Sequence, residues 1–355
     1  MKKLYTLLFV ALTGVSFGQL LTETFSYTVP GNIGGNTTTT TDATGSNNWL
    51  TQSNMSGNSG TIDVITGSLT YTGLAAATGN KVLLPGNNTA VPRDINRAFT
   101  SPSGTNVMYY SALINVIDNT QLAASPIAVG NTNSYFMSFG STAGTNVNIL
   151  NGRLAATTVN SGTNYRLQIN NNNSGTASNY TEFPTDLNFG TTYLVVVKVD
   201  ITSSPYVATL WVNPSTLGGT EASGSVSNNT GTNNTATTFG SIVLRNASAT
   251  AKVEIDEIRV GTTWASVTPE ASASLNDNNI DGLTMYPNPL KENTLHLTST
   301  ANAAMSVQIY DVLGKEVVNS KVMNNTVNVS SLNAGVYIVK VTEEGKTATR
   351  KLVIQ

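Results

Sequence analysis

The stretch Tyr193-Leu-Val-Val-Val-Lys-Val-Asp-Ile201 decides the fold. Its first five residues are all apolar, so both faces of the segment are apolar, as in a central strand that is covered on both sides. Similar runs of strand length recur before and after it, and nothing from Gln19 to Ala265 has the long 3.6-residue period of a helix. Turn-sized separators such as Gly152 and Gly162 indicate antiparallel pairing. We therefore predict an all-β chain whose larger part is an antiparallel two-sheet sandwich.

The composition excludes several classes of partner and site. Charged residues make up 11% of the chain, against about 25% in an average globular protein, and the net charge is −2. Because Lys and Arg do not cluster anywhere after residue 18, we expect no nucleic-acid or anionic-lipid partner. The chain has no cysteine, which excludes disulfides, thiolate zinc sites and an acylated lipoprotein cysteine.

The N-terminus has the three parts of a secretory signal peptide in order: Met1–Lys3, the apolar stretch Leu4–Val15, and Ser16–Gly18. We predict residues 1–18 as a signal peptide, cleaved between Gly18 and Gln19. Its apolar core is shorter than the roughly 20 residues that a membrane-spanning helix needs, and no second stretch is long enough, so we expect no transmembrane segment after cleavage. Sec export to the periplasm follows from this interpretation.

Changes in composition divide the rest of the chain into two domains. Residues 32–60, 170–179 and 223–238 are rich in Asn, Thr, Ser and Gly, and we expect them to be loops. The stretch Val267–Asn279 has no apolar period and indicates an interdomain linker, which we place at residues 266–282. The predicted domains are therefore residues 19–265 and residues 283–355.

The second of these domains is dense in short apolar runs. Asp311-Val-Leu-Gly314 and Asn333-Ala-Gly335 separate such runs, and each ends in a glycine able to take the positive φ of a tight turn. In the run after Gly335, Tyr337, Val339 and Val341 share one face, which is wholly apolar. A unit this small is expected to fold as a compact β-sandwich.

Four motifs follow one another in this domain. They are Tyr286-Pro-Asn-Pro289, Val307-Gln-Ile-Tyr-Asp-Val-Leu-Gly-Lys315, Leu332-Asn-Ala-Gly-Val-Tyr337 and Arg350-Lys-Leu-Val-Ile354. In this order they resemble the type A C-terminal sorting domain of the type IX secretion system. The resemblance implies an Ig-like β-sandwich that the type IX translocon recognises and a sortase-like protease removes, on a protein that ends extracellular or on the outer cell surface. It implies a sorting signal that includes Tyr286, Pro287, Asn288, Pro289, Gly314, Gly335, Tyr337 and Lys351. The alternative is a terminal Ig-like domain of an adhesin without a sorting role.

Three segments of the larger domain, Leu194–Asp200, Thr209–Pro214 and Lys252–Trp264, carry a second resemblance. They resemble the laminin-G-like, concanavalin-like jelly roll, over about residues 100–265. The resemblance implies a jelly-roll sandwich whose relatives bind glycans, proteins or calcium, so it informs the fold more than the ligand.

The segment Glu254-Ile-Asp-Glu257 resembles the Glu-x-Asp-x-Glu strand of jelly-roll β-glucanases. Here Ile stands at position 258, so the second catalytic Glu is missing from that face of the strand. The apolar phase changes between Ile255 and Ile258, which predicts a β-bulge near Asp256. The only histidine, His296, lies in the second domain, which excludes a Ser-His-Asp or metal-histidine site in the first. We assign no catalytic residue.

Few residues of the larger domain stand out as ligand-binding candidates. Trp49 lies in a polar loop and is the aromatic residue best placed to stack on a sugar, whereas Trp211 is expected in the core. Asp256 and Glu257 are further candidates for ligand contact. Calcium is the one cofactor these residues suggest, with Asp200 and Asp256 as oxygen donors, although no Asp-x-Asp-x-Asp loop is present.

The sequence leaves two functions as alternatives, and a third is less favoured. The first is a secreted, lectin-like module that binds glycan or extracellular matrix, because a neutral surface rich in Asn and Thr suits hydrogen bonding to sugars. The second is a non-catalytic surface adhesin or structural protein. The third is a polysaccharide-degrading glycoside hydrolase.

Overall fold

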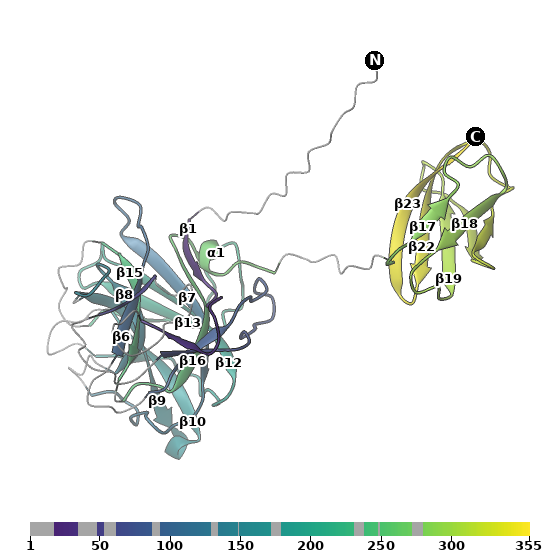
Figure 1. The fold of residues 1–355 in the computed structure, drawn as a ribbon. Helices are drawn as coiled ribbons and strands as arrows, with labels where there is room; N and C mark the ends of the chain where they lie inside the picture. The colour runs from purple at the N-terminus through teal and green to yellow at the C-terminus, as the bar shows by residue number, and fades with distance from the viewer. Residues whose placement is uncertain are drawn as a thin grey trace. The chain divides into compact units, whose positions relative to one another are not determined.

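The computed structural model describes residues 18–34, 48–52, 62–86, 93–128, 134–147, 149–171, 179–230, 238–247, 249–271 and 280–355 (Figure 1). They fall into two compact units, Met1–Ala271 and Ser272–Gln355, which we call the main unit and the tail unit. The predicted signal peptide lies outside the described residues except for Gly18. Both units are built from strands, so the predicted all-β fold is confirmed. Among the described residues, no helix has the length and apolar character needed to span a membrane.

The main unit consists of two antiparallel sheets, which form its two layers (Figure 1). The nine-stranded sheet has the order β14 (Val226–Asn228), β13 (Val207–Val212), β12 (Thr192–Asp200), β7 (Val107–Val116), β16 (Val253–Gly261), β5 (Lys81–Leu84), β4 (Ile62–Ile65) and β2 (Gly31–Ile33), with β1 (Gln19–Glu23) also paired to β16. The seven-stranded sheet has the order β11 (Thr181–Glu182), β10 (Asn164–Asn170), β9 (Leu150–Val159), β8 (Tyr135–Gly140), β15 (Ser241–Asn246), β6 (Arg93–Ala98) and β3 (Trp49–Thr51).

The main core lies between these two sheets. Tyr110 of β7 packs edge-on against Phe139 of β8, with ring centroids 5.0 Å apart. Its hydroxyl also donates a hydrogen bond of 2.8 Å to the backbone oxygen of Gly152 on β9. Contacts of this kind across the layers make the unit an antiparallel two-sheet sandwich, as expected.

The stretch that predicted a central strand forms β12, between β13 and β7. Val197 faces the main core, whereas Val196 faces a second apolar cluster that contains Trp211 and Trp264. The short helix α1 (Trp264–Val267) lies over that cluster. Both faces of β12 are therefore covered, which explains why its sequence is continuously apolar, and the expected burial of Trp211 is confirmed.

Several local predictions differ from the structure. The expected loops at residues 32–60 and 223–238 include strand residues of β2, β3 and β14. Gly152 lies inside β9 rather than in a turn, with φ +62° at a position where the register of β8 against β9 is irregular. Gly162 does end a turn, the 3-10 segment η1 (Asn160–Gly162) between β9 and β10. Residues 266–271, predicted as linker, pack on the main unit, because Val267 is fully buried and Ala271 N donates to Gly73 O at 2.8 Å.

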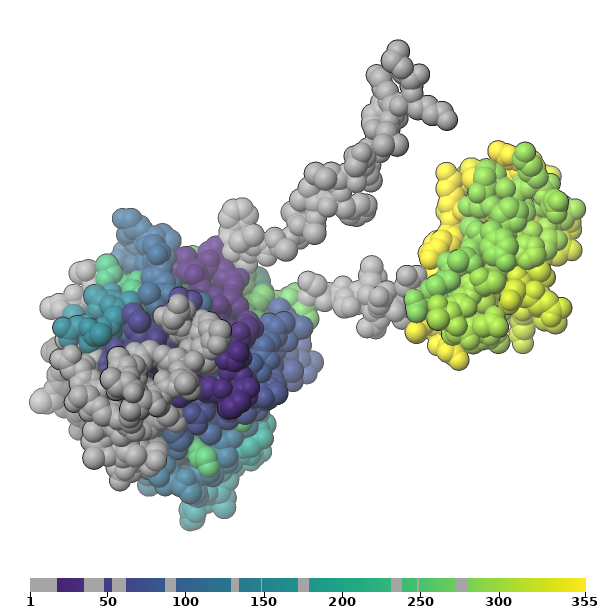
Figure 2. All heavy atoms as spheres, viewed as in Figure 1, coloured from purple at the N-terminus to yellow at the C-terminus, as the bar shows by residue number. Residues whose placement is uncertain are grey.

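The tail unit, green to yellow in Figure 2, is a small sandwich of two antiparallel sheets. One sheet has the order β17 (Thr284–Tyr286), β18 (Thr294–Thr298) and β21 (Thr326–Asn328), and the other β20 (Glu316–Lys321), β19 (Met305–Tyr310), β22 (Gly335–Glu343) and β23 (Lys346–Ile354). Leu295 and Leu297 from the first sheet share a buried core with Val339 and Val341 from the second. The predicted second β-sandwich is therefore confirmed.

Candidate functional site

Polar side chains cover the face of the seven-stranded sheet that points away from the main core. The alternate residues of the same strands, such as Leu244 on β15, Leu154 on β9 and Leu167 on β10, belong to that core. We call the polar set on the outer face the polar band; it consists of Asp94, Tyr135, Ser138, Arg153, Thr157, Arg166, Gln168, Glu182 and Arg245. These residues come from β6, β15, β8, β9, β10 and β11, which are consecutive in the sheet.

Charged and aromatic groups meet at the centre of the polar band. Arg245 Nη1 donates to Asp94 Oδ2 at 2.5 Å, across the register that pairs β15 with β6. The guanidinium groups of Arg153 and Arg245 lie 4.8 Å and 5.3 Å from the ring centroid of Tyr135. All of these side chains are buried or nearly so. Cation–π contacts with Tyr135 therefore hold both arginines on this face, and an ion pair with Asp94 adds to the hold on Arg245.

Burial shifts the titration of these central groups. It raises the pKa of Tyr135 to about 12. It also raises the pKa of Asp94, although the neighbouring Arg245 guanidinium opposes the shift. Desolvation lowers the pKa of Arg153. Shifted groups gathered on one face are typical of functional sites.

Several buried polar atoms of the polar band have no partner. In the part of the chain that the structure describes, Asp94 Oδ1, Ser138 Oγ and Arg245 Nε make no hydrogen bond. Ser138 is fully buried and Asp94 is 7% exposed. Because nearly all buried polar atoms in proteins are hydrogen-bonded, each of these three atoms needs an explanation, and a polar ligand is one.

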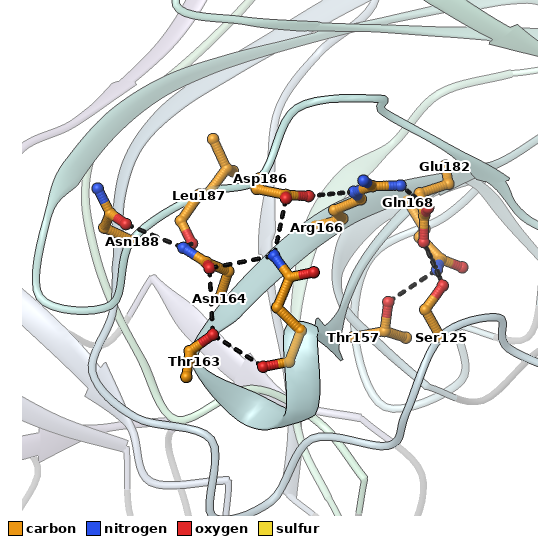
Figure 3. A network of polar contacts seen from close by, with 11 residues as sticks. Ser125, Thr157, Thr163, Asn164, Arg166, Gln168, Glu182, Asp186, Leu187 and Asn188 are labelled. Atoms are coloured by element: carbon orange, nitrogen blue, oxygen red, sulfur yellow. Dashed lines mark hydrogen bonds and ion pairs between the residues drawn. The ribbon is translucent and has the colours of Figure 1, made fainter.

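A denser network forms the β10–β11 end of the polar band (Figure 3). Arg166 lies between two carboxylates, 2.8 Å from Glu182 and 2.5 Å from Asp186. Gln168 Nε2 donates to Glu182 Oε2 at 2.9 Å and to Thr157 Oγ1 at 2.8 Å. These bonds fix the amide and carboxylate groups in place, so this end of the band is preorganised.

The turn next to this network is strained and has a hollow beside it. Asn160 has φ +51° and Ser161 has φ +55°, in the left-handed region that residues other than glycine rarely adopt. Asn160 Nδ2 donates to Asp186 Oδ2 at 2.8 Å, which ties the turn to the network. A hollow of about 500 Å³ lies beside the turn, lined mainly by hydroxyl, amide and small side chains, including Asn119 and Thr120.

Trp49 is not available for stacking on a sugar in this structure. Its side chain is fully buried on β3, with its ring stacked on Phe25 at a centroid distance of 5.9 Å. Its Nε1 donates to Glu23 Oε2 at 2.8 Å. The expectation of a polar-loop tryptophan is therefore corrected: the indole is part of the core and uses its N–H within the fold.

Asp256 and Glu257 lie in a β-bulge of β16, and the predicted bulge is confirmed by the register shift between Asp256 and Arg259. Asp256 accepts from Leu69 N at 2.8 Å and from Glu257 N at 2.7 Å, and burial raises its pKa to about 7. Glu257 accepts from Thr78 N at 2.9 Å and pairs with Arg259 at 2.5 Å. Both carboxylates are buried and hold residues 69–78 against β16, so the structure gives them an internal role and not an open ligand surface.

The two predicted calcium donors do not meet. Asp200 pairs with Val107 on β7 and Asp256 with Leu113 on the same strand, six residues further along, which corresponds to about 20 Å. Asp200 Oδ1 instead accepts from Thr202 N at 2.7 Å. Within the described residues, no group of three or more His, Cys, Asp or Glu side chains is placed to hold a metal ion.

In the tail unit, the Tyr286–Pro289 motif contacts the last strand. Asn288 Nδ2 donates to Lys351 O at 2.7 Å, and Asn288 Oδ1 accepts from Val353 N at 2.9 Å. The ring of Tyr286 is stacked on His296 of β18 at a centroid distance of 5.2 Å. Hydrogen bonds of the Asn288 side chain thus join the first predicted motif to the last.

The middle motifs form the turns of the four-stranded sheet. Gly314 has φ +82° in the turn between β19 and β20, where only glycine is unstrained. Gly335 begins β22, and Tyr337 Oη donates to Asn333 O at 2.9 Å. Lys351 is exposed on β23. The structure therefore places the predicted sorting residues in turns and on strand surfaces of one compact unit.

The polar band was missed by sequence reasoning, although its signal is present in the chain. Arg166, Gln168 and Asn170 alternate with the core residues of β10, which marks a strand with one polar face. What the alternation does not reveal is that Asp94 and Arg245, far apart in sequence, join the same face.

Comparison with known families identifies the end of the chain. Residues 284–355 match the family described as the secretion system C-terminal sorting domain. This tail indicates export to the cell surface or the extracellular space and interaction with the type IX secretion machinery. A search of curated proteins finds no match.

Solved structures similar to the chain include two enzymes. The endo-β-1,4-glucuronan lyase of the fungus Trichoderma reesei aligns at 15% identity with a TM-score of 0.38, over 64% of this chain and 96% of its own. The endo-1,3-β-glucanase of Streptomyces sioyaensis aligns at 12% identity with a TM-score of 0.34, over 68% of this chain and 95% of its own. At these TM-scores we draw no conclusion about function from either likeness.

Proposed function

We propose that this chain is a secreted glycan-binding protein that the tail unit directs out of the cell and whose main unit binds sugar on the polar band. The observation that carries the proposal is the set of buried polar atoms without partners, Asp94 Oδ1, Ser138 Oγ and Arg245 Nε, in the described residues. An unsatisfied buried polar atom costs about 1–3 kcal/mol, so a ligand that satisfies all three would bind with a clear gain.

Sugar hydroxyls suit this combination of groups. A hydroxyl both donates and accepts, so it can complete a carboxylate acceptor, a serine hydroxyl and a guanidinium N–H alike. The six strands that carry the polar band span about 24 Å at the usual spacing of about 4.8 Å, enough for a chain of several sugar units. Arg166 and Glu182, whose side chains are 30% and 25% exposed, form the accessible end of the polar band.

We also propose an export route for the chain and a fold class for the main unit. We place a signal peptide at residues 1–18, with Sec export to the periplasm before the type IX step. Of the predicted linker, residues 266–282, we keep the part between Ala271, bonded to the main unit, and Ile280, buried in the tail core. The type IX translocon acts on the tail unit and a sortase-like protease removes it. The main unit is assigned to the laminin-G-like class of jelly rolls.

A glycan array with the purified secreted chain identifies the ligand. A variant that lacks one hydroxyl of the polar band then tests whether the ligand binds there. Ser138→Ala removes an oxygen that bonds to nothing in the described protein, so the melting temperature should stay unchanged. Affinity for the best glycan should fall about tenfold, the effect of one lost hydrogen bond of about 1.4 kcal/mol. Isothermal titration and thermal unfolding measure the two quantities.

Ser111→Ala is the matched control. Ser111 is equally buried but lies on β7 in the other sheet, and its Oγ donates to Val267 O at 2.6 Å. This variant should melt at a lower temperature and bind the glycan as the wild type does. Unchanged affinity of Ser138→Ala would remove the polar band as the site. Binding to protein ligands without binding to any sugar would favour the adhesin instead.

A glycoside hydrolase is the less favoured alternative. Glu254, which would act as the nucleophile, is paired with Lys81 at 3.0 Å and lies on β16, in the sheet opposite to the polar band. Loss of polysaccharide cleavage in Glu254→Gln is the result that would favour an enzyme.

A further inference from the structure

A second hollow lies on the main unit, on the sheet that does not carry the polar band. Its volume is about 630 Å³, within the range of about 300–1,000 Å³ that small-molecule sites have. Residues 71–73, 214–217 and 270–271 line it. Tyr71 and Leu217 pack against the second apolar cluster, which lies on the outer face of the nine-stranded sheet. We call this feature the outer hollow.

Backbone hydrogen bonds fix the walls of the outer hollow. Residues 268–271 lie between the two loops that complete the lining. Ala271 N donates to Gly73 O at 2.8 Å, which joins these residues to the first loop. Gly218 N donates to Thr268 O at 2.7 Å, which joins them to the second. The hollow is therefore formed by the fold itself and is preorganised for a ligand.

Glu270 places a carboxylate in the outer hollow. Its side chain is exposed and lines the hollow. A Cβ added to Gly218 would lie 3.0 Å from Glu270 Oε1, so the missing side chain at Gly218 leaves room for the carboxylate. In the part of the chain that the structure describes, no salt bridge involves Glu270.

The lining segments bring no positive charge to this carboxylate. No Lys or Arg occurs in the three segments that build the outer hollow, residues 66–80, 213–225 and 262–271. The one other charged residue in them, Glu221, pairs with Lys198 at 2.8 Å. Arg259, in the bulge that holds the first of these segments, pairs with Glu257 at 2.5 Å. The negative charge of Glu270 is therefore left for a cationic ligand.

The other lining groups suit a sugar ring. Tyr71 supplies an aromatic ring, on which the apolar face of a sugar can stack. Thr72, Ser215 and Thr216 are exposed and supply hydroxyl groups, each of which donates and accepts. The linear stem of a lysine side chain would use neither the width of the hollow nor these hydroxyl groups.

We infer that the outer hollow binds an amino sugar, with the sugar ring on Tyr71 and the ammonium group at Glu270. The ammonium group supplies the charge that the lining segments lack, and it donates charge-assisted hydrogen bonds to the carboxylate. The main unit then has two glycan sites, one on each sheet. The inference goes beyond the proposed function, because the outer hollow shares no residue with the polar band.

The test titrates the purified secreted chain with a tetramer of glucosamine and with its N-acetylated counterpart, which has no charge. The wild type should bind the glucosamine tetramer about fivefold more tightly, the upper range for a solvent-exposed ion pair. Added salt should reduce this difference, because salt screens exposed charges. Isothermal titration at low and high ionic strength measures both effects.

Glu270→Gln removes the charge and keeps the shape of the side chain. Because Glu270 is exposed and has no salt bridge within the described residues, the melting temperature should stay unchanged. Affinity for the glucosamine tetramer should fall about fivefold, and the two tetramers should then bind alike. Asp63→Asn is the matched control: Asp63 is an exposed carboxylate on β4 of the same sheet but does not line the hollow, so this variant should bind as the wild type does.

Three results would overturn the inference. One is failure of the wild type to bind the glucosamine tetramer, and another is equal affinity of the wild type and Glu270→Gln. The third is a tetralysine peptide that binds as tightly as the glucosamine tetramer and loses affinity in Glu270→Gln, because the site would then recognise a protein amine.

The polar band can be tested separately. Ser138→Ala should leave the affinity for the glucosamine tetramer unchanged, and Glu270→Gln should leave unchanged the affinity for the glycan that binds the polar band. Loss of glucosamine binding in Ser138→Ala would place the amino sugar on the polar band and contradict the outer hollow. Failure of the polar band to bind any glycan would contradict the proposed function and leave this inference intact.

Discussion

Asn288 and Asp256 show how one side chain can take the place of a strand neighbour. The Asn288 amide donates to Lys351 O and accepts from Val353 N, as the backbone of an adjacent strand would. The Asp256 carboxylate likewise accepts two backbone N–H groups at a bulge where the ladder is interrupted. At such positions the side chain hydrogen-bonds backbone N–H or C=O groups that would otherwise have no partner, so another residue type could not replace it.

Asp256 should make stability depend on pH. Burial raises its pKa to about 7 in the folded state, against about 3.9 in the unfolded chain. Between these values the folded state holds a proton that the unfolded state has lost, so stability falls as pH rises from about 4 to about 7. The loss is on the order of 4 kcal/mol. In Asp256→Asn this contribution disappears, and denaturant unfolding measured at several pH values should show a weaker decline.

Asp63→Asn is the control for this prediction, because Asp63 is an exposed carboxylate on β4. It should retain the wild-type dependence on pH. Equal slopes for the wild type and Asp256→Asn between pH 4 and 7 would contradict the assignment.

At the scale of the element, the burial of β12 could be predicted from its sequence, whereas the place of Gly152 in β9 could not. The continuous apolar run of β12 predicts a strand buried on both faces, and the structure has it so. Gly152, by contrast, resembles a turn residue but lies within β9. An added Cβ there would lie 2.4 Å from Val199 Cγ2 of the facing sheet, so close packing and positive φ both require glycine.

Gly152→Ala should therefore destabilise the main unit by about 2–4 kcal/mol, from the strain of positive φ together with overpacking of the core. Gly104→Ala separates the two causes: Gly104 has φ +77°, and its added Cβ would have no neighbour within 4 Å. That control should cost about 1–2 kcal/mol. Denaturant unfolding gives both values, and equal losses would mean that the contact with Val199 has no effect.

At the scale of the whole molecule, the chain has two units with separate cores. We propose ligand binding for the main unit and sorting for the tail unit. The tail unit has its own buried cluster, so its removal should leave the main unit folded. A chain that stops at Asn279 should therefore remain inside the cell of a type IX-competent host, while its main unit unfolds at the wild-type temperature. Comparison of the culture medium with the cell fraction measures this directly. Undiminished release of the shortened chain would refute the sorting role.

The predicted sites differ in how well they were located by sequence. The tail motifs were found because each is a short run of consecutive residues that resembles a known family, and such a resemblance can be seen without knowing the fold. Trp49 was placed wrongly because its neighbours in sequence are polar, whereas its neighbours in space are Phe25 and Glu23. The polar band was not found because its members come from six strands.

The sequence by itself determined the all-β class, the central position of β12, the bulge at Asp256 and the tail with its motifs. The first three follow from periodicity and turn chemistry, and the tail motifs from their resemblance to a known family; all of them are patterns of neighbouring residues. Only the tertiary structure decided that Arg245 pairs with Asp94, that Trp49 is core and that Asp200 and Asp256 lie apart. Strand order and register decide which distant residues share a face, and they depend on the packing of the whole sandwich, which no local pattern records.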